Sequence, residues 1–182
     1  MKYEYSEDYK FTEKWFDPMI PNWDKLFGSY LQQNQIKDVL EVGCYEGRAT
    51  MYLLSEHLED DVNYEVVDTF GGSIEESGMS GTAERLTTSD FIYENFVHNT
   101  SLHRDITLSI HRASSQVKLP QLYAEGRLYD FIYIDASHKA DDTFVDAYYA
   151  HKMLRPGGLI IFDDFGWKDP HQPHISASRS RS

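Results

Sequence analysis

The stretch "LYDFIYIDASHKADD", residues 128–142, holds the pattern that decides the fold. Its apolar run stops at the carboxylate of Asp135, and His138 follows three residues later. Short apolar runs bounded in this way are typical of buried β-strands. The residues that follow, 140–154, repeat apolar side chains at helical spacing, which predicts an amphipathic helix. The apolar face of that predicted helix carries Phe144, Ala147, Tyr148, His151 and Leu154.

The same alternation of strand and helix runs along the whole chain. Strands are predicted at 38–43, 63–68, 105–112, 129–135 and 159–165. Helices are predicted at 7–16, 22–34, 46–58, 86–100 and 140–154. Alternation implies right-handed β-α-β units, so we predict an α/β fold with a Rossmann-like, doubly wound, mostly parallel sheet flanked by helices. Ligands of such sheets bind beyond the carboxyl ends of the strands, where Gly43, Asp68, Asp135 and Asp163 lie.

Composition narrows the classes of partner. The chain has 182 residues, 41% of them hydrophobic, and a formal net charge of −13. Such an acidic surface repels phosphate backbones and anionic lipids, so we expect no nucleic-acid and no membrane partner. Cys44 is the single cysteine, which excludes an intrachain disulfide and fits a reducing compartment. The N-terminus is too charged for a signal peptide and no apolar run is long enough for a membrane span, so we predict a cytoplasmic protein.

The turn after the first predicted strand, "LEVGCYEGRAT", spaces two glycines four residues apart, at Gly43 and Gly47. This spacing lacks the Gly-x-Gly-x-x-Gly dinucleotide fingerprint, because Tyr45 stands where a second glycine is required. Asp68 ends the second predicted strand, where an acid can accept both hydroxyls of a ribose. Tight helix–strand packing and a strand-end turn are the alternative explanations of these residues. Their combination on consecutive strands favours a nucleoside ligand.

Five stretches in order, "VLEVGCYEGRAT", "VVD", "RASSQVKLPQL", "YDFIYIDASH" and "LRPGGLIIFDDF", resemble class I S-adenosylmethionine-dependent methyltransferases. The resemblance runs from Val39 to Phe165. It is strongest to the metal-dependent O-methyltransferases of small molecules, which are the catechol, caffeoyl-CoA, macrolide-sugar and aminocoumarin-sugar types. It implies that S-adenosylmethionine is the cofactor and that a small hydroxylated molecule is the methyl acceptor.

The resemblance also implies which residues bind the cofactor. Glu41, Gly43 and Gly47 would surround its methionine end, and Asp68 its ribose. Ser114 would lie near the adenine, although Arg112 replaces the glycine that the family has two residues earlier. Further expected cofactor contacts are Cys44, Tyr45, Thr69 and Asp135. A small buried filler is the alternative for Cys44.

Carboxylates follow the fourth and fifth predicted strands. Neighbouring strands lie about 4.8 Å apart, so Asp135, Asp163 and Asp164 can converge on one divalent cation such as Mg²⁺. The resemblance implies the same metal ligands, and it places His138, together with Asp135, in catalysis. A free histidine side chain titrates near neutrality, so His138 is the predicted general base, with Lys139 as the fallback. Turn caps and surface acids are the alternative explanation, but they leave the mutual repulsion of three carboxylates without compensation.

The predicted organisation is an N-terminal helical cap at 1–35, a cofactor-binding methyltransferase domain at 36–168, and a disordered polar tail at 169–182. The family sheet has seven strands, and the sequence after Phe165 contains no candidate for strands 6 and 7. The fifth strand is then an open apolar edge, for which we expect homo-oligomer formation or cover from the N-terminal helices. An impaired or dead cofactor-binding module is the alternative function. A nicotinamide-dependent oxidoreductase is disfavoured by the missing fingerprint.

Overall fold

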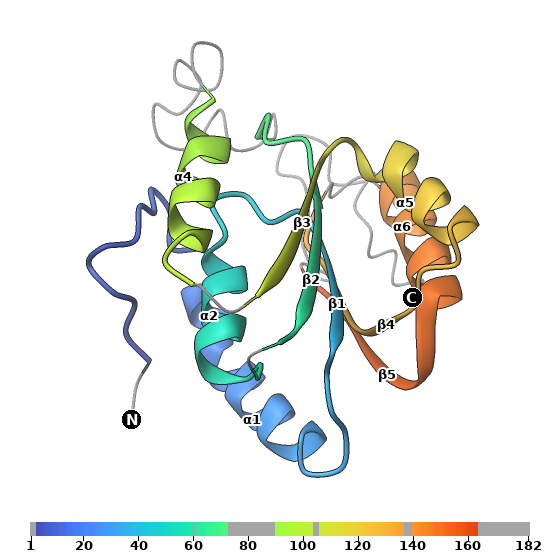
Figure 1. Ribbon diagram of the computed structural model, residues 1–182, viewed down its shortest axis with the longest axis horizontal. Helices are drawn as coiled ribbons and strands as arrows, with labels where there is room; N and C mark the ends of the chain where they lie inside the picture. Colours follow the sequence, from blue (N-terminus) through green and yellow to red (C-terminus); the bar gives the residue numbers. More distant parts are fainter. Residues whose placement is uncertain (1–2, 60, 73–89, 104–105, 137–139, 164–182) are drawn as a thin grey trace, which may run out of the picture. The chain divides into compact units, whose positions relative to one another are not determined.

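The computed structural model describes residues 3–59, 61–72, 90–103, 106–136 and 140–163. Its strands form one parallel sheet with the order β3-β2-β1-β4-β5 (Figure 1). The bounds are Asp38–Val42 for β1, Asn63–Asp68 for β2, Thr107–Arg112 for β3, Tyr129–Ile134 for β4 and Leu154–Phe162 for β5. The predicted α/β fold with a mostly parallel sheet is therefore confirmed.

Helices alternate with the strands along the chain (Figure 1). They are η1 (Asp17–Met19), α1 (Ile20–Tyr30), α2 (Arg48–Glu56), α4 (Phe91–Thr100), α5 (Ser115–Ala124) and α6 (Ala140–Met153). The chain divides into two compact units: a first unit of Met1–Lys37, Cys44–Asn63 and Phe70–Thr107, and a second unit of Asp38–Gly43, Tyr64–Thr69 and Leu108–Ser182. No helix within the described ranges is long and apolar enough to cross a membrane.

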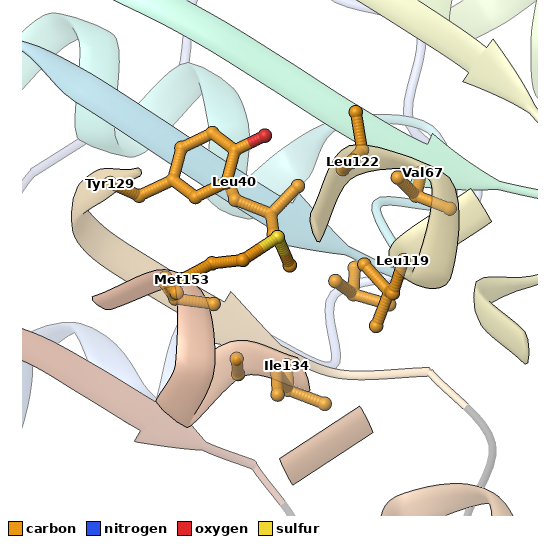
Figure 2. Close-up of a cluster of buried hydrophobic side chains, with 10 residues drawn as sticks. Leu40, Val67, Leu119, Leu122, Tyr129, Ile134 and Met153 are labelled. Atoms are coloured by element: carbon orange, nitrogen blue, oxygen red, sulfur yellow. The ribbon is translucent and has the colours of Figure 1, made fainter. Parts of the chain in front are cut away.

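The core of the second unit lies between one face of the sheet and the helices α5 and α6 (Figure 2). Alternate strand residues point to the same face, so Leu40 and Val42 of β1 share this side of the sheet with Ile132 and Ile134 of β4. Its buried members are Leu40, Val42, Val67, Leu119, Leu122, Tyr129, Ile132, Ile134, Ala150 and Met153. Burying each large aliphatic side chain stabilises the fold by about 1.5–3 kcal/mol relative to exposure.

Helix α6 buries a different face from the one its sequence predicts. Phe144 is 74% exposed and Tyr148 is 50% exposed, whereas Asp146, Ala150 and Met153 are buried. These three residues follow the i, i+4, i+7 spacing of one helix face. The prediction was wrong because it chose the helix face with the two large aromatic side chains as the buried one. The face that is buried contains a small residue and a carboxylate, which do not look like core residues in the sequence.

The predicted helix at 7–16 is absent, and residues 3–16 are irregular. Besides local turns such as the one closed by the Tyr9 N–H and the Ser6 carbonyl, at 3.3 Å, their backbone groups bond to side chains far along the chain. The Lys10 N–H donates to Asn99 Oδ1 at 2.7 Å, and the Thr12 N–H donates to Glu46 Oε2 at 2.6 Å. These side chains accept hydrogen bonds from backbone N–H groups that a helix would otherwise pair internally.

Arg48 also holds this N-terminal segment within the first unit. Its guanidinium makes two hydrogen bonds to the Asp17 carboxylate, at 2.6 and 2.8 Å. The same group lies 4.1 Å from the ring centroid of Tyr5 and 4.8 Å from that of Phe11. A planar guanidinium suits both the paired hydrogen bonds and the aromatic contacts.

Helix α1 and strand β5 begin at residues other than the predicted ones. Helix α1 begins at Ile20 rather than 22, because Pro21 is accepted in the first turn of a helix. Asn22 is therefore inside the helix and does not cap it. Strand β5 begins at Leu154 rather than 159, and its pairing with β4 shifts register between Tyr129 and Phe131.

Candidate functional site

The carboxyl ends of three strands are joined by backbone hydrogen bonds in the second unit. The Asp135 N–H donates to the Val42 carbonyl at 2.8 Å, which ties the end of β4 to the end of β1. The Asp163 N–H donates to the Ile134 carbonyl at 2.9 Å, which ties the end of β5 to the end of β4. The predicted convergence of Asp135 and Asp163 at one edge of the sheet is therefore present in the structure.

At position 43, packing between the strands leaves room only for glycine. Its φ is +84°, and a Cβ atom built on it would lie 2.0 Å from the carbonyl oxygen of Asp135. No side chain fits such a space, and L-residues disfavour this backbone conformation. The close approach that Gly43 allows in the structure is therefore to the backbone of the neighbouring strand.

The phenol of Tyr133 lies between the two strand-end carboxylates. Its oxygen is 3.0 Å from Asp135 Oδ2 and 2.5 Å from Asp163 Oδ2. Tyr133 is fully buried. Burial, followed by the charges of Asp135 and Asp163, raises the pKa of the Tyr133 phenol well above its ordinary range. The hydroxyl therefore stays protonated and donates a hydrogen bond to the acid pair.

Glu41 lies on the same face of the sheet as Tyr133, because both are odd-numbered positions of paired strands in register. Glu41 is fully buried, and the Tyr64 hydroxyl donates to its Oε2 at 2.7 Å. The charge of Glu41 adds to the rise in the pKa of the Tyr133 phenol. A buried carboxylate is costly unless hydrogen-bonded, so this position is built to keep an acceptor at the strand end.

The other cofactor candidates of the second unit lie at the ends of β2 and β3. Asp68 is half-buried, and its carbonyl accepts the Ala113 N–H at 3.0 Å. Ser114 follows directly as the N-cap residue of α5, with an extended backbone and no capping bond from its side chain. Thr69 is exposed. The structure thus brings Asp68 and the start of α5 together, while their roles toward ribose and adenine stay predictions.

The remaining turn residues belong to the first unit. Cys44 is buried, as the filler alternative predicts, and its carbonyl accepts the Gly47 N–H at 2.7 Å. Gly47 has a φ of +81°, and a Cβ there would lie 2.9 Å from the ring of Phe96. The ring of Tyr45 lies 5.2 Å from that of Trp15, centroid to centroid. Tight packing thus accounts for the glycine at 47, and the cofactor contacts of Cys44, Tyr45 and Gly47 stay predictions.

The residues present fit part of a divalent-cation site. The carboxylates of Asp135 and Asp163 both lie within hydrogen-bonding distance of one phenolic oxygen, so the two acids are close together. Mg²⁺ binds through one or two carboxylates and keeps positions for substrate oxygens and water. Asp164, His138 and Lys139 lie outside the described residues. Within those residues, no group of three His, Cys, Asp or Glu side chains gathers as metal ligands.

Sequence reasoning missed the two tyrosines that organise the acids. Tyr133 precedes Asp135 by two residues, and residues two apart in a strand point to the same face. That spacing was a usable signal for a contact between the phenol and the carboxylate. The bond from Tyr64 to Glu41 had no comparable signal, because it depends on how β1 and β2 pair.

Comparison with known proteins shows which family the chain belongs to. A family model described as "Methyltransferase domain" matches residues 40–165, which is more than half of the chain. Comparison with curated protein sequences gave no match.

Solved structures with a similar fold include a SAM-dependent methyltransferase from Agrobacterium tumefaciens, at 14% identity and a TM-score of 0.58 over 81% of this chain and 44% of that one. An O-methyltransferase from Bacillus cereus in complex with SAH matches at 21% identity and 0.50, over 78% and 56%. CalS11, a TDP-rhamnose 3′-O-methyltransferase of calicheamicin biosynthesis, matches at 16% and 0.53, over 86% and 65%. The chain thus spans 44–65% of the length of these three proteins, and at such identities the likeness shows the fold alone. The chain therefore belongs to the methyltransferase-domain family, and its sheet is that of the S-adenosylmethionine-dependent methyltransferases.

Proposed function

We propose that this domain transfers a methyl group from S-adenosylmethionine to a hydroxyl of a small molecule, with the help of a divalent cation. One observation carries the proposal: Asp135 and Asp163 meet around the Tyr133 phenol at the carboxyl edge of the sheet. The backbone of Gly43, where the cofactor turn begins, contacts the backbone of Asp135 directly. The acid pair and the start of the cofactor turn are therefore adjacent within one unit.

Methyl transfer to oxygen is an in-line displacement. The bond from sulfur to the methyl carbon breaks as the bond from the acceptor oxygen forms, and the acceptor hydroxyl loses its proton. A cation held by Asp135 and Asp163 would lower the pKa of that hydroxyl and fix its position. Asp135 and Asp163 supply the negative charge and the oxygen ligands for this. His138, three residues beyond Asp135, is proposed to accept the proton.

The cofactor is proposed to bind along the same edge. Glu41, kept buried and hydrogen-bonded by Tyr64, supplies an acceptor near the methionine end. Asp68 is proposed to accept the ribose hydroxyls, and Ser114 at the start of α5 to contact the adenine. The Ala113 N–H, bonded to the Asp68 carbonyl, fixes the distance between these two positions.

An oxygen acceptor fits this site better than an amine. A neutral hydroxyl is a weak nucleophile until it loses its proton, so carboxylates that hold a cation have a clear purpose there. The net charge of −13 favours a small acceptor over a nucleic acid.

The test combines cofactor binding with turnover. Calorimetry with S-adenosylhomocysteine, with and without Mg²⁺, measures binding, and a panel of catechol, sugar and polyketide acceptors measures methylation. We expect Asp163→Ala to lower cation-dependent turnover by about 100-fold or more, while the Kd for S-adenosylhomocysteine changes by less than about threefold. Asp141→Ala, an exposed acid in the first turn of α6, is the matched control and should leave both values unchanged.

Two outcomes would contradict the proposal in different ways. Undiminished turnover under strong chelation would indicate a methyltransferase that needs no metal. Tight binding of S-adenosylhomocysteine with no turnover on any acceptor would indicate the cofactor-binding module instead.

A further inference from the structure

Tyr133 is held rigidly between the two acids by its strand. Its β4 neighbours pair with β5 in regular register, with Tyr133 opposite Ile161 and Ile134 opposite Phe162. The side chain is fully buried, so its ring has no room to leave this position. The phenolic oxygen is therefore a fixed point against which the carboxylates of Asp135 and Asp163 are placed.

The phenol also limits how far the carboxylates separate. With bonds of 3.0 and 2.5 Å to one oxygen, the two Oδ2 atoms are no further apart than the 5.5 Å these lengths add up to. The phenol contacts Oδ2 of each carboxylate, so a cation and the phenol can use different oxygens of the same acids. The phenol has one hydroxyl hydrogen to donate to the pair.

We propose that Tyr133 is a positioning residue that sets the separation and orientation of Asp135 and Asp163, and thereby raises their affinity for a divalent cation. This proposal rests on the proposed function, because it assigns Tyr133 a role toward the cation of that site. Groups that hydrogen-bond metal-binding carboxylates from outside typically change metal affinity by about 10–100-fold when removed. The Tyr133→Phe variant keeps both carboxylates and removes only the donor that they share.

The experiment measures cation binding directly. Mn²⁺ is titrated calorimetrically and by electron paramagnetic resonance into wild type and Tyr133→Phe, with S-adenosylhomocysteine present. We expect the Kd for Mn²⁺ to rise about 10–100-fold, with the Kd for S-adenosylhomocysteine within about twofold of wild type. Higher Mg²⁺ should then restore turnover of the variant, which a general loss of structure would not allow.

Tyr129→Phe is the matched control. Tyr129 lies on the same strand and also donates to a carboxylate, Glu65 Oε2 at 2.6 Å, but it faces the core between the sheet and α5. Its loss should lower stability and leave the Kd for Mn²⁺ unchanged. An equal loss of Mn²⁺ affinity in both variants would overturn the role of Tyr133.

A second measurement needs no substitution and covers the case in which Tyr133→Phe does not fold. Wild-type protein labelled with ¹³C at the tyrosine ring carbon that bears oxygen is titrated with Mg²⁺. A tyrosine signal that shifts with the calorimetric Kd supports the proposal, and no shift in any tyrosine signal overturns it. Mn²⁺ that binds wild type and Tyr133→Phe equally defeats this proposal alone, whereas a wild type that binds no cation defeats it together with the cation-assisted reaction.

Discussion

Asp146 offers the sharpest test of the packing in the second unit. The residue lies on α6 and is fully buried, and neither carboxylate oxygen has a hydrogen-bond partner within the ranges the structure describes. Burial raises the pKa of Asp146 from 3.8 to about 6, and the charge of Asp142 adds to the rise. The nearby Ser115 hydroxyl lowers that pKa in part, although it is not placed at full hydrogen-bonding geometry. We therefore expect Asp146→Asn to stabilise the protein at alkaline pH.

The magnitude follows from the pKa of Asp146. A rise from 3.8 to about 6 corresponds to at most about 3 kcal/mol, since one unit is worth about 1.4 kcal/mol. The folded state binds the proton more tightly than the unfolded state, so wild-type stability falls as the pH rises from about 4 to about 6. The asparagine amide is also buried without partners, so we expect a net gain of about 1–2 kcal/mol at pH 8.

The assay is urea unfolding followed by circular dichroism, for wild type and Asp146→Asn at several pH values between 8 and 4. The difference in the free energy of unfolding should shrink across the window from about 6 to about 4, where wild-type Asp146 becomes protonated. Asp141→Asn is the control, because Asp141 is exposed on the same helix and its variant should show no such gap. The reasoning would be refuted if Asp146→Asn were less stable than wild type at pH 8, or if the difference in the free energy of unfolding did not change with pH.

Two further predictions concern the backbone of the sheet. Gly43→Ala should lower the free energy of unfolding by about 3 kcal/mol or more, because its Cβ would lie 2.0 Å from a backbone carbonyl oxygen. The control is Gly126→Ala, at a position with a φ of +75° and open space around it. That substitution should lower the free energy of unfolding by only about 1 kcal/mol. Equal losses in urea unfolding would show that the steric argument at Gly43 is wrong. In the described sheet β5 is an edge strand, so we expect it to pair with a second copy of the chain, and sedimentation should show a dimer that dissociates on dilution. A monomer at every concentration would exclude that pairing.

The acid pair could be predicted because its signals are local and the topology is simple. Asp135 and Asp163 each follow an apolar run, and neighbouring parallel strands end at the same edge. Gly43 was also identifiable as a special backbone position, and the structure shows that a Cβ there would collide with the carbonyl of Asp135.

The errors arise where distant residues decide local structure. Residues 7–16 have helix-compatible composition, but their backbone groups bond to Glu46 and Asn99, which no local pattern reveals. The core face of α6 includes Asp146, and a buried carboxylate contradicts the usual rule that charged residues face water. Tyr133 was counted as one member of an apolar strand, although its hydroxyl hydrogen-bonds to Asp135 and Asp163.

The position of the acids depends on the opposite face of the same strand. Ile132 and Ile134 bury their side chains in the core against α5 and α6, so Tyr133 and Asp135 must point the other way. A register slip by one residue would move the Asp135 carboxylate into the apolar core, and burying an unpaired charge there costs far more than the lost hydrogen bonds. The packing of the isoleucines therefore fixes where the carboxylate lies. Gly43 has no Cβ to clash with the Asp135 carbonyl and so permits β1 to meet β4 in this register, and the apolar core and the position of Asp135 both depend on that strand pairing.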